Sequence, residues 1–222
     1  MPVDYSHVSP SEAISIQKEI RNQVNLVPLD REIKTIAGAD ISFNKHSDTV
    51  YAGIIVLSYP ELEIIESATT VFKTTFPYVP GLLAFREVPA LQQVWQQLNH
   101  KPDALILDGH GIAHPRRVGV ASHFGILEGV VTIGCAKSLL AGSFKMPENV
   151  PFSTSPMVHR EETIGTALRT KVNCKPVFIS PGHLITLDES VDIVKHCTRR
   201  YRIPEPTRLA HLLVNKVRKE HK

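Results

Sequence analysis

The sequence has little cysteine and no long hydrophobic run. Its three cysteines are widely spaced and form no C-x-x-C pair, which argues against a disulfide framework or a cysteine zinc site and is consistent with a reducing cytosol. Apolar stretches such as residues 51–57 and 104–107 fall far short of the roughly 18 residues that span a bilayer. The first residues lack the pattern of a signal peptide, so none is expected. We therefore expect a cytoplasmic protein that makes no use of a membrane.

The composition also disfavours disordered and fibrous proteins. Hydrophobic residues make up 42% of the chain and charged residues 21%, near the globular averages of roughly 45–50% and 25%. A length of 222 residues is close to that of one domain, since single domains typically run from about 100 to 200 residues. We expect a single domain over residues 1–222 that ends in basic helices.

Acidic residues are scarce at the end of the chain. Residues 195–222 carry nine lysines and arginines against Glu205 and Glu220, a net charge of +7, whereas the whole chain has a net charge of +3. The residues before them therefore sum to −4. A basic end on a mildly acidic body indicates a polyanionic partner such as nucleic acid, although a solvated tail has the same composition.

Local signals predict a helix and then three antiparallel strands. A capping box with proline at the first helical position opens a helix over residues 9–25. β-Branched runs at 35–43, 50–59 and 62–76 predict strands. The short links between them, such as the turn-like residues 44–48, predict antiparallel pairing.

The middle of the chain predicts parallel strands. A helical pattern follows Gly81, and Pro89 is expected to kink or restart that helix. A short buried strand at 103–107, a helix near 118–127 and a strand at 130–133 come next. Strand, helix and strand in this order predict a parallel crossover connection.

The last third of the chain predicts a loop, two strands and two helices. Residues 141–160 contain three prolines and are expected to form a loop. Extended runs at 163–170 and 176–180 follow, and helices are expected over 186–201 and 206–219.

The predicted order of elements is βββαβαβ followed by helices. By analogy this order resembles the ribonuclease H-like fold, an α/β class in which a mixed sheet of three antiparallel strands followed by parallel strands is flanked by helices.

Three carboxylates stand where a metal site is expected. Asp40 lies within the first predicted strand, where an unpaired acid among apolar neighbours is unfavourable by several kcal/mol. Asp108 directly follows the strand 103–107, and Glu87 lies on the helix between the two strands. Carboxylate oxygens without thiolates suit Mg²⁺ or Mn²⁺ and phosphoryl chemistry. Taken singly, each acid has a commoner structural role: an Asp at a strand end usually caps a turn, and a Glu is usually a surface residue.

Histidines and one lysine are further candidates. His110 and His114 have the i, i+4 spacing of a helical zinc site, but the neighbouring glycines and proline make a helix improbable, so a loop or phosphate contact is preferred. Lys137 follows a strand near Asp108, where it can hold a phosphate or a water. His211 lies in the last predicted helix, and by itself reads as an ordinary helix-face residue.

A short aromatic loop is stiffened by prolines on both sides. Tyr78 lies between Pro77 and Pro80. Such a loop is either a plain turn or a rigid wedge that replaces a base extruded from a nucleic acid stack.

The sequence resembles the endonuclease V family. Long runs of consecutive identical residues occur in the same order from roughly Gly38 to His211. The segments that carry the resemblance are Pro77-Tyr78-Val79-Pro80-Gly81, Phe85-Arg86-Glu87, Asp108-Gly109-His110-Gly111-Ile112-Ala113-His114-Pro115-Arg116-Arg117, Gly119-Val120-Ala121-Ser122-His123 and Pro204-Glu205-Pro206-Thr207-Arg208.

The resemblance implies a ribonuclease H-like nuclease that uses Mg²⁺ or Mn²⁺ to nick deaminated nucleic acid at the second phosphodiester on the 3′ side of inosine. By position it makes Asp40, Glu87 and Asp108 the metal carboxylates and Lys137 the active-site lysine. His211 falls at a position that varies between Asp and His in the family. It is therefore either a metal ligand or a proton acceptor that contacts the ligands and not the metal.

We expect the protein to act, as a monomer, on DNA that contains deoxyinosine. The residues expected to contact nucleic acid are Pro77, Tyr78, Pro80, His114, Arg116 and Arg117. Glycines let the chain approach a flat base closely, and those expected at the base pocket are Gly81, Gly109, Gly111, Gly119 and Gly134.

Three alternatives stay open on the sequence alone. An endoribonuclease specific for inosine would share every motif, because the contacts to the 2′-hydroxyl are not readable from motifs. Another nuclease of the same fold would share the acids but leave Tyr78 without a purpose. A non-catalytic binding module would use the basic helices but not the three carboxylates and Lys137.

Overall fold

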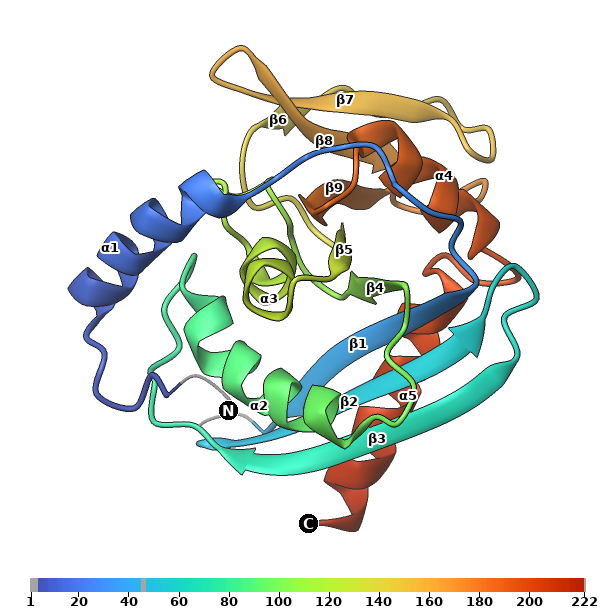
Figure 1. Ribbon diagram of the computed structural model, residues 1–222. Coiled ribbons are helices and arrows are strands. Elements are labelled where there is room, and N and C mark those ends of the chain that lie inside the picture. Colours follow the sequence, from blue (N-terminus) through green and yellow to red (C-terminus); the bar gives the residue numbers. More distant parts are fainter. Residues whose placement is uncertain (1–3, 45–46, 222) are drawn as a thin grey trace.

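One mixed nine-stranded sheet forms the centre of the molecule in this computed structural model (Figure 1). The structure describes residues 4–44 and 47–221. The turn expected at 44–48 includes Lys45 and His46, which lie outside the described residues.

The strand order places the parallel strands in the middle of the sheet. The order is β3-β2-β1-β4-β5-β9-β8-β7-β6; β1, β2 and β3 pair antiparallel, β1, β4 and β5 pair parallel, and β9 pairs antiparallel to β5. This mixed sheet confirms the expected fold class. The strands are β1 Thr35–Phe43, β2 Thr49–Ser58, β3 Ile64–Lys73, β4 Ala104–Leu107, β5 Val131–Ala136, β6 Ser143–Phe144, β7 Thr154–His159, β8 Glu162–Leu168 and β9 Val177–His183.

Two helices, α1 and α4, begin at the caps that the sequence predicts. Ser9 and Thr186 each form the expected capping box with the glutamate three residues later. No described helix is long and apolar enough to cross a membrane. The helices are α1 Pro10–Ile20, the 3₁₀ turn η1 Arg21–Gln23, α2 Leu83–Gln97, α3 Val120–Glu128, α4 Leu187–His196 and α5 Glu205–Glu220.

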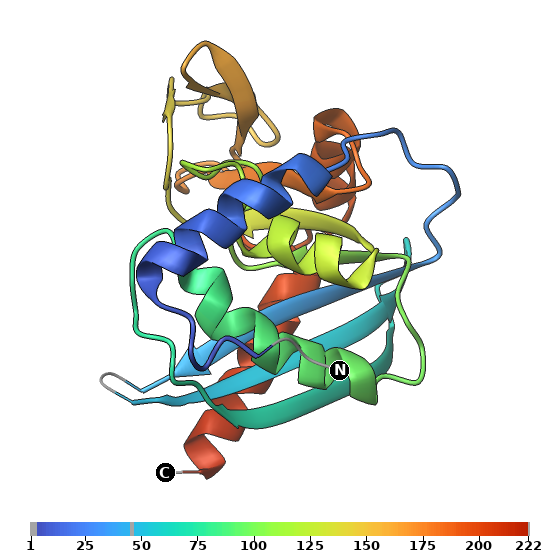
Figure 2. The same cartoon turned by 60° about the vertical axis from the view of Figure 1, so that its left-hand side comes forward.

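Alternation along the central strands divides the core between the two faces of the sheet. Ala37 and Ala39 of β1 pack with α2 and α3 on one face, and Ile36 packs with α4 and α5 on the other. Figure 2 shows α5 crossing behind the strands that α2 covers from the front. Gly38 lets α5 approach, because a Cβ there would lie 2.0 Å from the carbonyl oxygen of Pro206.

Pro89 does not interrupt α2, so the expected restart of the helix there is wrong. The helix runs without a break from Leu83 to Gln97 with Pro89 inside it. Eleven of its residues are buried, including Val88 and Ala90 beside the proline. Packing against the sheet therefore outweighs the backbone hydrogen bond that proline removes.

The loop expected at 141–160 is only partly a loop. Residues 143–144 and 154–159 form β6 and β7, and β7 pairs with β8. Its burial alternates, with Ser155 and Met157 inside. Pro156 is tolerated because its part of β7 lies at the edge of the sheet, where no ladder hydrogen bond is required of it.

Helix α4 ends at His196, five residues before the expected end at Tyr201. Residues 197–204 instead form an irregular connection, which the Glu205 N–H closes by donating to the carbonyl of Cys197 at 2.9 Å. This connection brings the Arg202 side chain to the segment that follows β5, where it donates to the Lys137 carbonyl.

Candidate active site

Asp40 and Asp108 meet where two parallel strands run side by side. Ala39 of β1 is in register with Leu107 of β4, and the Asp108 N–H donates to the Ala39 carbonyl at 3.2 Å. The two carboxylates therefore each follow one of a pair of residues in register on adjacent central strands. Both are largely buried, with side chains 9% and 14% exposed.

His211 reaches the same point from α5. Its Nδ1 lies 2.7 Å from Oδ2 of Asp40. One ligand atom from each of Asp40, Asp108 and His211 lies within 4.8 Å of the others, a grouping that can hold a metal ion.

Asn215 favours one tautomer of His211, the one with its proton on Nδ1. The Asn215 Oδ1 accepts hydrogen bonds from Ser42 at 3.1 Å and from the Arg218 guanidinium at 2.9 Å. Arginine only donates, so the amide nitrogen must face His211, where it lies 3.1 Å from Nε2. In the neutral imidazole Nε2 is then the acceptor, and Nδ1–H donates to Asp40. Ligation of a cation through Nδ1 would require the loss of this hydrogen bond.

Glu87 lies on α2, outside the group of three. Its side chain is buried, and burial raises its pKa well above the usual value, with further increases from the charges of Asp40 and Asp108 and an opposing effect of Arg86. A buried acid near two others is unfavourable as an anion.

The carboxylates repel one another in the absence of a cation. Burial raises the pKa of Asp40 to about 6, and the charge of Asp108 adds to the shift, while the hydrogen bond from His211 opposes it. A cation beside the two carboxylates would reverse this electrostatic penalty. The donor set, carboxylate oxygens and at most one imidazole, fits a hard divalent ion.

Lys137 approaches from the segment that follows β5. Its ammonium pairs with Oδ2 of Asp108. The main chain of Lys137 is also held, because its carbonyl accepts a hydrogen bond from Arg202 at 3.0 Å.

A cavity of about 370 Å³ adjoins the carboxylates and shares Asp108 and Lys137 with them. Its other lining residues come from α1, from the loop before α2, from α2 and α3, from the end of β5, and from the segments after β4 and β5. They are Gln17, Tyr78, Val79, Pro80, Gly81, Leu83, Ala84, Gly109, His110, His114, Val118, Gly119, Val120, Ala136, Ser138, Leu139 and Leu140.

Two of the five glycines expected at a base pocket do not line this cavity. A Cβ on Gly111 would lie 2.0 Å from the Pro181 carbonyl oxygen, and one on Gly134 would lie 2.3 Å from the Gly111 nitrogen. These two glycines allow strands and loops to pack closely behind the cavity. Gly81, Gly109 and Gly119 do line it.

The aromatic loop before α2 is anchored at its last residue. The Gly81 carbonyl accepts hydrogen bonds from Gln17 at 3.1 Å, His114 at 3.0 Å and Arg116 at 2.7 Å. Tyr78, by contrast, is 64% exposed. These hydrogen bonds hold the end of the loop in place, while the Tyr78 ring is exposed at the mouth of the cavity.

The histidine and the two arginines expected to contact nucleic acid have partners within the protein. His114 and Arg116 donate to the Gly81 carbonyl. Burial lowers the pKa of His114 to about 4, so this histidine is neutral at pH 7. Arg117 pairs with Glu162 at 2.6 Å and borders a separate hollow. Pro77 does not line the cavity, whereas Pro80 does.

The sequence interpretation missed Asn215, Gln17 and Arg202. Asn215 had a signal, since it lies four residues after His211 and so on the same helix face. Gln17 and Arg202 had none, because their partners lie in segments distant in the sequence.

Comparisons with known proteins point to one family. Residues 18–212 match the family model for endonuclease V. Curated relatives named endonuclease V from Myxococcus xanthus and Thermosipho melanesiensis are each 46% identical to this chain, over 96% and 91% of it and 91% and 88% of their own lengths.

Solved structures agree. The endonuclease V of Streptomyces avermitilis superposes with a TM-score of 0.91 at 39% identity, covering 96% of this chain and 94% of its own. That of Ciona intestinalis, in complex with DNA containing an inosine followed by a ribo-adenosine, superposes with a TM-score of 0.85 at 32% identity, over 96% and 98%. With the family matched over most of its length, this chain belongs to the endonuclease V family and is an endonuclease.

Proposed function

We propose that the protein nicks DNA at deaminated bases, chiefly deoxyinosine, by hydrolysing the second phosphodiester on the 3′ side of the lesion and leaving a 5′-phosphate and a 3′-hydroxyl. The observation that carries this proposal is the cavity that shares Asp108 and Lys137 with the carboxylate cluster. A base held in the cavity and a phosphate held at the carboxylates belong to one strand. The Ciona relative in complex with inosine-containing DNA supports the choice of substrate.

Asp40, Asp108 and Glu87 would hold Mg²⁺, for which Mn²⁺ can substitute. When bound, the cation offsets the charge of the phosphate under attack and makes water a better nucleophile. His211 orients Asp40 through its Nδ1–H, and Asn215 keeps His211 in that tautomer.

Lys137 supplies positive charge beside the cluster. Its ammonium lies against Asp108 and is 37% exposed, so it can also contact a phosphate oxygen or the attacking water. The hydrogen bond from Arg202 to its carbonyl fixes the start of this side chain.

Selection of hypoxanthine would come from backbone groups of the cavity wall. Hypoxanthine presents an acceptor at O6, where adenine presents an amino donor. A backbone N–H aimed at O6 would meet adenine donor to donor, and each buried unpaired group costs about 1–3 kcal/mol. Guanine would be rejected by crowding of its 2-amino group. Tyr78 would fill the gap that the extruded base leaves in the stack.

Inosine-containing RNA is a second candidate substrate. The Ciona complexes carry a ribo-adenosine directly after the inosine, so that relative binds a ribose there. The same site in this protein would then accept RNA as well as DNA.

One experiment tests both candidates. Purified protein is incubated with end-labelled DNA duplexes, single strands and RNA, each with one inosine, in Mg²⁺ or in EDTA, and the cut is mapped to the nucleotide. We expect nicking in Mg²⁺ only, at the second phosphodiester, with no cut in adenine controls. Cutting at adenine controls at the same rate, or in EDTA, would contradict the proposal.

A further inference from the structure

Tyr201 forms an exposed aromatic and basic cluster with two arginines near the active site. The ring is 48% exposed. The Arg208 guanidinium carbon lies 4.5 Å from the ring centroid and that of Arg200 lies 6.0 Å from it. We call Arg200, Tyr201 and Arg208 the tyrosine cluster.

The tyrosine cluster is held in place before any ligand arrives. Glu205 fixes the Arg208 guanidinium with hydrogen bonds of 2.9 and 2.6 Å. The next residue after the ring, Arg202, donates to the carbonyls of Lys175 and Pro176, each at 2.7 Å. Because hydrogen bonds hold the segment that carries it, the Tyr201 ring loses little conformational freedom on binding.

The tyrosine cluster lies close in the chain to two residues that contact the catalytic end of the sheet, His211 and Arg202. Arg208 precedes His211 by three residues on α5, so the two share a helix face. Arg202 donates to the carbonyl of Lys137. The cavity is lined from α2 and α3, which cover the other face of the sheet from α5 (Figures 1 and 2). His211 of α5 contacts Asp40, and Asp108 lines the cavity, so the carboxylates connect the side of the sheet that α5 covers with the cavity.

We propose that the tyrosine cluster binds the substrate strand beyond the cut, with a nucleobase stacked on Tyr201 and a backbone phosphate beside Arg200. This inference rests on the proposed function, because a strand whose lesion occupies the cavity and whose scissile phosphate lies at the carboxylates continues toward α5. Exposed aromatic rings beside arginines are the usual platform for single-stranded nucleic acid. Arg200 is exposed, and its charge has no acidic partner among the described ion pairs.

The test varies the length of the strand beyond the cut. Single-stranded DNA with one deoxyinosine and a constant 5′ arm is made to end one, two or five nucleotides after the mapped cut. We expect kcat/KM of the unmodified protein to rise with length, and Tyr201→Ala to lose this rise, by about fivefold or more on the longest strand. Tyr201→Phe should retain it, since the ring is kept.

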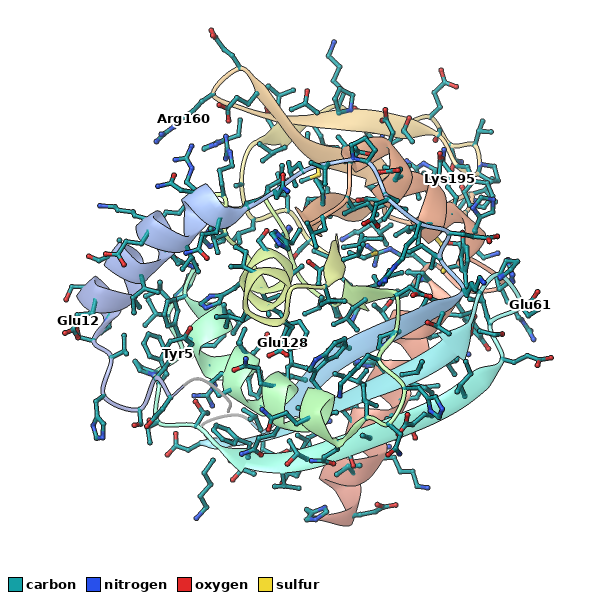
Figure 3. The ribbon with its side chains drawn as sticks, viewed as in Figure 1. Tyr5, Glu12, Glu61, Glu128, Arg160 and Lys195 are labelled. Carbon is teal, nitrogen blue, oxygen red and sulfur yellow. The ribbon has the colours of Figure 1, made fainter. Side chains whose placement is uncertain are left out.

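A charge control and a binding measurement complete the test. Arg200→Ala should lower the affinity and the salt dependence of binding, whereas Arg160→Ala, in the turn between β7 and β8 (Figure 3), should change neither. The affinity for the 5′-phosphorylated five-nucleotide fragment alone, measured in EDTA, should also fall in Tyr201→Ala.

Equal losses at every length, or an unchanged affinity for the fragment, would overturn the binding role and leave Tyr201 a packing residue. Failure of the unmodified protein to nick any inosine strand would count against the proposed function instead. In that case a fragment affinity that depends on Tyr201 would still support the tyrosine cluster.

Discussion

His211 and Asp40, 171 residues apart in the sequence, are joined by a hydrogen bond of 2.7 Å between Nδ1 and Oδ2. This contact ties α5 to β1 at the carboxylate cluster. Asn215 faces the other ring nitrogen, so the imidazole presents its N–H to Asp40 rather than a lone pair to a cation.

Replacement of His211 should therefore weaken the metal site without destroying it. We expect His211→Ala to lower nicking by about 10–100-fold at limiting Mg²⁺, the usual effect of losing a group that orients a metal ligand. Saturating Mg²⁺ should recover much of the rate. Asp40→Asn and Asp108→Asn, which replace a charged ligand with a neutral amide, should lose nicking by orders of magnitude at every Mg²⁺ concentration. Nicking rates across a Mg²⁺ titration measure both effects, and a folded Asp40→Asn variant with the parental rate would exclude the metal role.

Stability without metal should fall as the pH rises from about 4 to about 6. The pKa of Asp40 is 3.8 when unperturbed and about 6 in the folded protein. Between these values the folded state holds a proton that the unfolded state has lost, so each rise in pH favours unfolding. Urea denaturation in EDTA at several pH values should show this slope, and Asp40→Asn should reduce it. A slope that is unchanged in Asp40→Asn would show that other groups produce it.

Mg²⁺ should stabilise the protein more at pH 7 than at pH 5. Protons and the cation compete for the same carboxylates, so the apparent affinity for Mg²⁺ should increase as Asp40 ionises. The measurement is the rise in melting temperature on adding Mg²⁺ at each pH. An equal rise at both values would mean that the cation stabilises the fold from another site.

Tyr78 should matter more in a duplex than in a single strand. Extrusion of a base from a stack costs a few kcal/mol, and a ring that fills the gap offsets part of this cost. Tyr78→Ala should therefore lower kcat/KM on an inosine duplex more than on a single strand of the same sequence. Losses of the same size on both substrates would indicate that the exposed ring does not act as a wedge.

Gly134 and Ser138 should separate packing from recognition. Gly134→Val places side-chain atoms against the Gly111 backbone, so it should lower the melting temperature by several degrees, as a loss of 1 kcal/mol or more would in a domain of this size. Ser138 is exposed and lines the cavity, so Ser138→Phe should crowd the base and reduce inosine nicking while stability and Mg²⁺ binding persist. Parental nicking by Ser138→Phe would place the base elsewhere.

The sequence by itself determined the elements whose signals are local. The capping boxes at Ser9 and Thr186 set the starts of α1 and α4, and β-branched runs gave β1 its full extent at Thr35–Phe43. The sequence also identified Asp40 and Asp108 as candidate site residues, because an acid within or directly after an apolar strand is unfavourable unless it is paired or binds a metal.

Only the tertiary structure decided the features that depend on partners distant in the chain. Pro89 lies inside a helix because the sheet packs against it, and β7 forms because β8 pairs with it. Gly134 packs against Gly111 instead of facing the cavity, and Arg116 bonds to Gly81 within the protein. The physical reason is common to all four: composition and spacing report a residue's own preferences, whereas burial and hydrogen bonding are set by neighbours that the fold supplies.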